Sequence, residues 1–219
     1  MKVVVFGATG MVGQGVVREC LLADDVTTVV AIGRTSAGID DPKFSEVLRT
    51  DLFALDDVAE LSDVDACFFC LGVPSTGMNE ADYTRITHDL TVSVAEAIAA
   101  RNPKATFVYV SGQGADSSEK SRVMWARVRG RTENQLLTGP LNAYILRPGY
   151  IQPRHGARSK VTLYRLLYRV TSVLYPVLRL LAGNHITTTE TVGRAMLALA
   201  RGRGDSRVLN SPEMNAISR

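Results

Sequence analysis

The stretch Lys2-Val3-Val4-Val5-Phe6-Gly7-Ala8-Thr9-Gly10-Met11-Val12-Gly13 decides the fold, because it joins an apolar strand to a glycine-rich turn and a helix start. A strand that ends in glycines lets the backbone turn tightly and approach a pyrophosphate. The helix that follows offers its free N–H groups and the positive end of its dipole to the same phosphates. The sequence therefore predicts a dinucleotide site. Its expected contacts in this stretch are Gly7, Thr9, Gly10, Met11, Val12 and Gly13.

Size and composition predict one globular domain. The chain has 219 residues, of which 46% are hydrophobic and 21% charged, which is ordinary for a folded protein and too short for two large α/β domains. We expect residues 1–219 to form a single domain, with about 150–219 contributing a cap over the substrate. The net charge of +3 favours anionic ligands but is too small to indicate a nucleic-acid partner.

The sequence shows no targeting or membrane segment. Lys2 leads directly into core residues, so no signal peptide is expected before the first strand. No apolar run reaches the ~18–20 uncharged residues of a transmembrane span. These features predict a cytoplasmic protein.

Strand and helix patterns alternate along the chain with short connections, which predicts a parallel sheet with crossover helices. The expected strands are rich in Val, Ile and Phe on both faces, as in a sheet that helices cover from both sides. The predicted fold class is α/β, a doubly wound parallel sheet (Rossmann) with a small helical C-terminal cap. We expect strands near 2–6, 28–32, 45–49, 64–71, 105–111 and 142–147, and helices near 11–23, 55–61, 79–101, 119–138, 160–181 and 190–201.

The C-terminal third carries an apolar segment over 161–182 that arginines interrupt and that Pro176 is expected to kink. One interpretation is a lid or wall over the substrate cleft, and the other is a surface that meets a partner subunit or the membrane interface. Thr187 and Glu190 have capping-box spacing, which predicts the start of the last helix. Ser211–Arg219 is predicted to be a short, loosely held tail.

The cysteine pair Cys67 and Cys70 lies in an apolar strand, where residues three apart point to opposite faces. Two thiols on opposite faces cannot share a metal ion or form a disulfide. They are therefore predicted to be buried strand cysteines, with no metal site.

The choice of cofactor depends on the end of the second strand. A site for NAD usually has an Asp or Glu about 20 residues beyond the glycines, which accepts from the ribose 2′-OH. Here that place holds Arg34 with two hydroxyl residues beside it, and a guanidinium suits a 2′-phosphate. NADP is therefore favoured over NAD. Asp51 and Leu52, after the third strand, are expected at the adenine edge.

With the glycine turn and the Asp51-Leu52 pair, three more segments follow an ordered pattern: Cys70-Leu71-Gly72, Val110-Ser111-Gly112 and Leu146-Arg147-Pro148-Gly149-Tyr150-Ile151-Gln152-Pro153. This pattern resembles the extended and atypical short-chain dehydrogenase/reductases, a branch that holds sugar-nucleotide epimerases, dehydratases and small NADP-binding regulators. The resemblance covers about 1–200, and it implies cofactor contacts at Leu71, Gly72, Pro148, Gly149 and Ile151. It also implies a short strand that meets a helix over 186–195.

The resemblance also implies where the chemistry would lie. The family uses a Tyr-x-x-x-Lys pair with a Ser at the end of the fifth strand, and Ser111 fits that Ser. Trp125 and Arg129 stand where the Tyr and Lys are expected, and Thr87 stands where the family has a supporting Asn. An indole N–H does not exchange its proton near neutral pH, so Trp125 cannot be the general acid. Arg129 keeps its charge and can still hold the ribose.

Other residues are candidates for the missing proton donor. Tyr150 follows the Pro148-Gly149 turn and is a candidate to face the nicotinamide. Further candidates are Tyr83, His88 and His155. The expected catalytic set is therefore Ser111, Arg129 and Tyr150.

Two functions remain open at this point. The first is an NADP(H)-binding reductase-like protein, weak or unusual in activity, that acts on a small carbonyl compound. The second is a catalytically silent NADP-binding sensor or scaffold that regulates a protein partner. Replacement of the Tyr favours the second, whereas Ser111 and a cation at position 129 favour the first.

Overall fold

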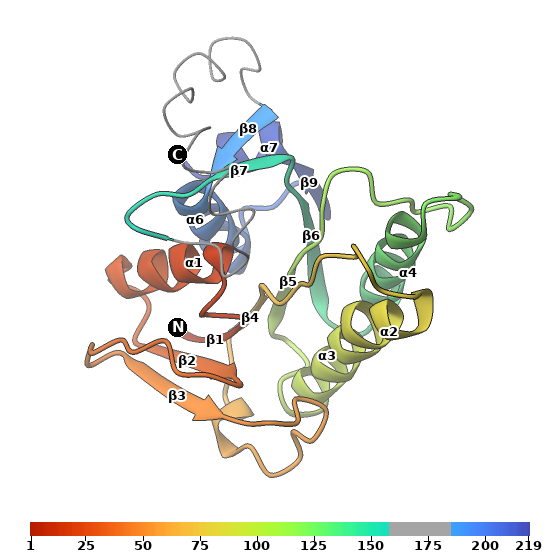
Figure 1. Cartoon of the computed structure of the whole chain (residues 1–219). Coiled ribbons are helices and arrows are strands. Elements are labelled where there is room, and N and C mark those ends of the chain that lie inside the picture. The colour runs from red at the N-terminus through yellow and green to blue at the C-terminus, as the bar shows by residue number, and fades with distance from the viewer. Residues whose placement is uncertain (158–184) are drawn as a thin grey trace.

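Figure 1 shows the computed structural model of the chain, which describes residues 1–157 and 185–219. Within these residues, one sheet of seven parallel strands has the order β3-β2-β1-β4-β5-β6-β9. This topology confirms the predicted doubly wound α/β fold. The strands are β1 (Lys2–Phe6), β2 (Thr28–Gly33), β3 (Phe44–Leu48), β4 (Ala66–Phe69), β5 (Thr106–Val110), β6 (Asn142–Arg147) and β9 (Val208–Asn210).

Helices cover both faces of the sheet (Figure 1). One face packs against α1, α6 and α7, and the other packs against α3 and α4. Side chains of β1 alternate between these two cores: Val3 and Val5 join the first, and Val4 and Phe6 join the second. The helices are α1 (Met11–Leu22), α2 (Glu80–Thr84), α3 (Leu90–Arg101), α4 (Met124–Thr138), α6 (Thr189–Ala200) and α7 (Ser211–Ile217).

The strand order reverses between β1 and β4, and the turn after β1 lies against the end of β4. Gly7 adopts φ +86°, and a Cβ atom added to it would lie 2.8 Å from the backbone of Cys70 and Leu71. A Cβ added to Gly13 would lie 2.1 Å from the carbonyl oxygen of Gly7. Only glycine fits at these two positions. Open α/β sheets bind their ligands at such a reversal, outside the carboxyl ends of the strands.

A second, two-stranded parallel sheet follows β6. β7 (Tyr150–Gln152) pairs with β8 (Ile186–Thr188), which leads directly into α6. The short strand that the resemblance implies before the last helix is thereby confirmed. The helix predicted over 160–181 lies outside the described residues. In the part of the chain that the structure describes, no helix combines the length and hydropathy needed to cross a bilayer.

Two predicted helices are shorter or divided in the structure. The stretch 55–61 forms only a 3₁₀ turn, η1 (Ala59–Leu61). The buried residues of the stretch 55–61, namely Leu55, Val58 and Leu61, are three apart, which suits 3₁₀ rather than α geometry. The predicted helix 79–101 is divided by a π-helical segment, η2 (Arg85–Asp89), between α2 and α3.

The starts of two later helices also differ from the prediction. The helix expected from 119 begins at Met124, because the Asp116 carboxylate accepts from the backbone N–H groups of residues 118, 120 and 121 and holds them in a turn. The capping-box spacing places a Thr187 cap before the last predicted helix. The N-cap is instead Thr188, whose hydroxyl accepts from the Thr191 N–H at 3.0 Å.

The C-terminus is a packed helix, so the prediction of a loose tail was wrong. β9 extends the sheet at its edge, and α7 follows with a capping box between Asn210 and Glu213. Met214 is fully buried in the core that α6 and α1 share. One apolar side chain among polar neighbours gives too weak a pattern to indicate a buried helix from the sequence.

Met214→Ala is expected to lower the free energy of unfolding by about 2–5 kcal/mol, because it leaves a cavity in this core. Urea denaturation followed by circular dichroism measures the loss. The control is Ala216→Lys on the exposed side of α7, which is expected to stay within about 0.5 kcal/mol of the parent chain. Equal stability of the two variants would contradict the packing of α7.

Candidate functional site

A cavity of about 360 Å³ lies at the glycine turn and the end of β2. The turn after β1 and the loop after β2 both contribute residues to its wall. Arg34 stands at this cavity, is exposed, and makes no hydrogen bond or ion pair with any other described residue. The lining residues are Gly7, Ala8, Thr9, Ala31, Ile32, Gly33, Arg34, Thr35, Glu46, Leu48, Leu52 and Leu71.

The first turn of α1 suits an anion. Gly10 is its N-cap and offers no side chain to the backbone N–H groups that follow. No acidic residue occurs in that turn, so the positive end of the helix dipole is not neutralised there. These features fit the pyrophosphate of a dinucleotide.

Glu46 of β3 reaches the same cavity and holds the loop that carries Arg34. Its carboxylate accepts from the Ser36 hydroxyl and from the Ala37 backbone N–H, each at 2.5 Å. The carboxylate oxygens of Glu46 are therefore both engaged within the loop. Glu46 was not anticipated from the sequence, although the alternation of side chains along β3 places it on the same face as the cavity.

A larger cleft of about 790 Å³ adjoins the first cavity, and Leu71 lines both. It lies at the carboxyl ends of β1, β4, β5 and β6, which is the expected place for the reacting end of a dinucleotide and its substrate. The lining residues are Gly10, Met11, Val12, Cys70, Leu71, Gly72, Val73, Pro74, Ser75, Thr76, Tyr83, Val110, Ser111, Gly112, Gln113, Gly114, Trp125, Arg129, Pro148, Gly149 and Ile151.

Glycines after β5 make room for the large side chains of α4. A Cβ added to Gly114 would lie 3.1 Å from the Trp125 indole, so the ring packs against that backbone. A Cβ added to Gly112 would lie 2.6 Å from Nη1 of Arg129. The Val-Ser-Gly-x-Gly pattern thus positions a flat aromatic ring and a cation on one wall of the cleft.

Arg129 is a well-supported cation. Its Nε donates to the Tyr83 hydroxyl oxygen at 3.1 Å. Burial disfavours its charge, but Tyr109, Tyr83 and Glu133 together raise the pKa of the guanidinium above its usual value. Arg129 therefore stays charged in the cleft, as a residue that binds ribose hydroxyls or an oxyanion requires.

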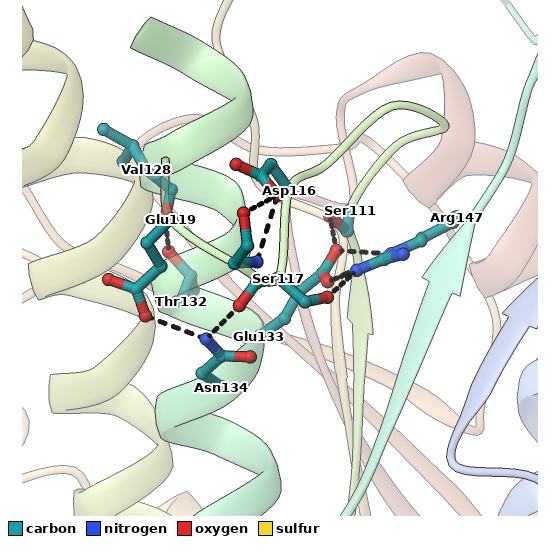
Figure 2. A network of polar contacts seen from close by, with 10 residues as sticks. Ser111, Asp116, Ser117, Glu119, Val128, Thr132, Glu133, Asn134 and Arg147 are labelled. Atoms are coloured by element: carbon teal, nitrogen blue, oxygen red, sulfur yellow. Dashed lines mark hydrogen bonds and ion pairs between the residues drawn. The ribbon is translucent and has the colours of Figure 1, made fainter. Parts of the chain in front are cut away.

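Ser111 belongs to a buried polar network (Figure 2). Its hydroxyl donates to Glu133 Oε1 at 2.5 Å, and Glu133 is 1% exposed. Arg147 of β6 donates to both oxygens of the same carboxylate, with Nε at 3.1 and 3.0 Å and a close contact from Nη2. Arg147 also donates to the Ser117 hydroxyl at 2.6 Å. The hydrogen of Ser111 is therefore committed to Glu133, and only its lone pairs are left for a ligand.

The loop after β5 is fastened to α4 as well. The backbone N–H of Asp116 donates to the Ala126 carbonyl at 3.0 Å, and a Cβ added to Gly130 would lie 1.7 Å from the Asp116 carbonyl oxygen. Hydrogen bonds from Ser118 and the following backbone hold the pKa of the Asp116 carboxyl below its usual value. The wall of the cleft is thus built on a closely packed loop and helix.

Most expected site residues line the two cavities, and three do not. Asp51 is exposed and its carboxylate accepts from the Phe53 N–H at 2.9 Å. Gly13 lies buried behind the glycine turn. Tyr150 donates to Gln152 Oε1 at 2.9 Å, so both point to the side of β7 opposite Ile151, which lines the cleft.

The remaining candidates for a proton donor divide in the same way. Tyr83 lines the larger cleft, whereas His88 and His155 line neither cavity and contact Asp89 and Glu190 instead. Thr87 is buried, and its carbonyl accepts from the Thr91 hydroxyl at 2.6 Å. Gln113 was not anticipated and stands at the cleft because its N–H donates to the Pro148 carbonyl at 2.9 Å.

The three cysteines are free thiols, and two of them flank the end of β4. Cys67 packs in the α3 and α4 core and Cys70 against the opposite core, as their spacing predicted. Burial raises the pKa of the Cys70 thiol to about 12. Although Cys70 lines the cleft, its thiolate is not formed near neutral pH.

Comparisons with known proteins agree with this geometry. The model of the NAD(P)H-binding family matches residues 7–168. The mitochondrial protein fmp52-2 of Aspergillus terreus is 26% identical over 167 aligned residues, which cover 74% of this chain and 72% of that protein.

Solved structures show the same fold at low identity. An oxidoreductase of the short chain dehydrogenase/reductase family from Burkholderia thailandensis aligns with a TM-score of 0.66 and 16% identity, over 94% of this chain and 88% of that one. The UDP-glucuronic acid 4-epimerase from Bacillus cereus, in complex with NAD, aligns with a TM-score of 0.66 and 16% identity, over 96% of this chain and 78% of that one.

Glu133→Leu is expected to lower the free energy of unfolding by about 3–5 kcal/mol, because it leaves the Arg147 charge without its partner. In the double variant Glu133→Leu/Arg147→Met both charges are absent, so we expect most of that loss to be recovered. Urea denaturation of Glu133→Leu, Arg147→Met and the double variant measures the coupling energy between the two residues. Losses that simply add would contradict the pairing drawn in Figure 2.

Proposed function

Because this chain belongs to the NAD(P)H-binding family, we propose that it binds NADP(H) and uses it to reduce a small carbonyl compound. One observation carries the proposal: the cavity at the glycine turn adjoins, at Leu71, a cleft lined by the half-buried cation Arg129 and by hydroxyl groups. The bound cofactor supplies the hydride, and the chain supplies binding, orientation and a proton.

Each end of the cofactor has its proposed contacts. The turn from Gly7 to Gly13 holds the pyrophosphate, and Leu52 packs beside the adenine, with Asp51 at its edge as a prediction. Arg129 holds the nicotinamide ribose, and Pro148, Gly149 and Ile151 form the wall behind the ring. Ser111 faces the substrate and can accept a hydrogen bond from it through its lone pairs, since its own hydrogen goes to Glu133.

Two observations favour NADP over NAD. Arg34 is exposed at the first cavity and has no partner among the described residues, so its guanidinium can take a 2′-phosphate. The nearby carboxylate, Glu46, is occupied by Ser36 and Ala37. It is therefore a poor acceptor for the 2′-OH on which NAD selectivity usually depends.

The second candidate is a silent NADP-binding sensor or scaffold that acts on a protein partner. Trp125 is the residue that favours this alternative, because the resemblance places it where the family has its catalytic Tyr. Its ring packs against Gly114 in the cleft, and its indole N–H can donate a hydrogen bond but cannot act as a general acid. The cytoplasmic location stays a prediction, and the relative fmp52-2 carries the word mitochondrial in its name.

Arg34→Ala is expected to raise the Kd for NADPH roughly 10- to 100-fold, because the 2′-phosphate loses a charged hydrogen bond. Binding of NADH, which lacks that phosphate, is expected to stay the same. Quenching of Trp125 fluorescence measures both, since Trp125 is the single tryptophan and lines the cleft. Arg203→Ala, which lines neither cavity, is the control. Equal affinity of the parent chain for NADH and NADPH would overturn the role of Arg34.

Trp125→Tyr separates the two candidate functions. If the chain is a reductase that has lost its usual acid, the phenol is expected to raise turnover by up to about 10²-fold. The measurement is NADPH oxidation with a panel of aldehydes, quinones and ketones. Tight NADPH binding without turnover in either chain would exclude the reductase and leave the sensor.

A further inference from the structure

Tyr83 is the one tyrosine among the described residues that line the larger cleft, and the proposed function gives it no task. Asn79 caps α2 through its side chain, which accepts from the Asp82 N–H at 2.8 Å, and α2 packs against α4. An ion pair of 2.6 Å between Glu80 and Arg127 joins the two helices. These contacts hold Tyr83 of α2 against Arg129 of α4.

The hydroxyl of Tyr83 accepts one hydrogen bond and donates none to the described residues. Its oxygen accepts from Arg129 Nε at 3.1 Å, and no residue in 1–157 or 185–219 accepts its hydrogen. Tyr83 lines the cleft and is only 1% exposed, so its side chain forms part of the cleft wall and has little contact with solvent. Its O–H bond is therefore available to an oxygen atom of a ligand there.

Neighbouring hydroxyl groups are less suited to release a proton into the cleft. Tyr109 lies beside the same arginine, but its ring packs 6.0 Å from that of Phe69 and it does not line the cleft. Burial raises the pKa of the Tyr109 phenol. The hydrogen of Ser111 already goes to Glu133.

We propose that Tyr83 is a catalytic residue, which donates a proton to the carbonyl oxygen of the substrate while Arg129 holds the phenolate that remains. This inference rests on the proposed function. It pairs a phenol from α2, Tyr83, with a cation from α4, Arg129. The carbonyl carbon receives the hydride, the C=O π bond breaks, and its electron pair takes the proton of Tyr83. The products are an alcohol, oxidised cofactor and a phenolate that recovers its proton from water.

The titratable and charged groups around this pair come from three elements. Tyr83 belongs to α2, Arg129 and Glu133 to α4, and Tyr109 to β5. The Glu133 carboxylate is paired with Arg147 and also supports the charge of Arg129. The Arg129 charge beside the Tyr83 oxygen can stabilise the negative charge that develops there during the reaction.

The test is Tyr83→Phe in the full chain, with Tyr109→Phe as a matched control that removes a hydroxyl beside the same arginine. Para-nitrobenzaldehyde and menadione serve as probe substrates for NADPH oxidation. We expect kcat to fall roughly 10²–10⁴-fold in Tyr83→Phe, with little change in KM, because a general acid is lost. We expect no such fall in Tyr109→Phe.

Two binding measurements accompany the kinetics. Trp125 fluorescence is expected to report an unchanged Kd for NADPH in both variants. Benzoate serves as an oxyanion probe of the cleft, and its Kd is expected to rise roughly tenfold in Tyr83→Phe, because one hydrogen bond to a charged acceptor is lost. Thermal unfolding of each variant verifies that it is folded.

Each outcome bears on the assignment. A fall in kcat of less than roughly tenfold would overturn it, since general acids contribute more than that. A fall in kcat with unchanged benzoate affinity would make Tyr83 a support for Arg129 and would also overturn it. A parent chain that binds NADPH but reduces neither probe overturns the proton donor and leaves cofactor binding intact. A chain that binds no NADPH overturns the proposed function itself.

Discussion

The contact between the turn after β1 and the end of β4 is the constraint on which the site depends. A Cβ at Gly7 would lie 2.8 Å from the Cys70 backbone, and one at Gly13 would lie 2.1 Å from the Gly7 carbonyl oxygen. Side chains at these positions would push β1, β4 and α1 apart. Because the backbones meet, the uncapped first turn of α1 opens onto the point where the strand order reverses, and both cavities adjoin that point.

Helix α4 arranges one wall of the larger cleft. Trp125, Arg129 and Glu133 are four residues apart and lie on one face of the helix, on successive turns. Trp125 and Arg129 face the cleft, whereas Glu133 is buried and paired with Arg147. The Glu133 carboxylate also binds the Ser111 hydroxyl. One buried ion pair thereby fixes the depth of α4 against β5 and β6, and with it the positions of the aromatic ring and the cation.

Much of the fold, and much of the lining of the first cavity, could be predicted from the sequence, because those features depend on the local pattern. Apolar runs indicated six of the seven strands of the main sheet, and the glycine turn indicated where the first cavity lies. Features that depend on distant contacts were missed. Tyr150 follows Pro148 and Gly149 and was therefore a candidate to face the nicotinamide. It lies instead in a short strand that pairs with the distant β8, and the alternation along that strand turns Tyr150 away from the cleft. Met214 and Glu46 show their roles only once α7 packs on the sheet and β3 lies beside β2.

The two cavities of the site differ in the elements that line them, and this difference bears on function. The glycine cavity is lined chiefly by the turn after β1, the end of β2 with the loop that follows it, and residues of β3. The larger cleft depends on side chains that α2, α4 and β5 supply separately. A substitution on α4 can therefore remove an acid without disturbing cofactor binding, and a hydroxyl from another helix can approach the same cation. The 3.1 Å hydrogen bond from Arg129 of α4 to the hydroxyl oxygen of Tyr83 of α2 is a contact of this kind. Retention of the fold therefore does not determine the chemistry, because the chemistry depends on the few O–H groups that face the cleft.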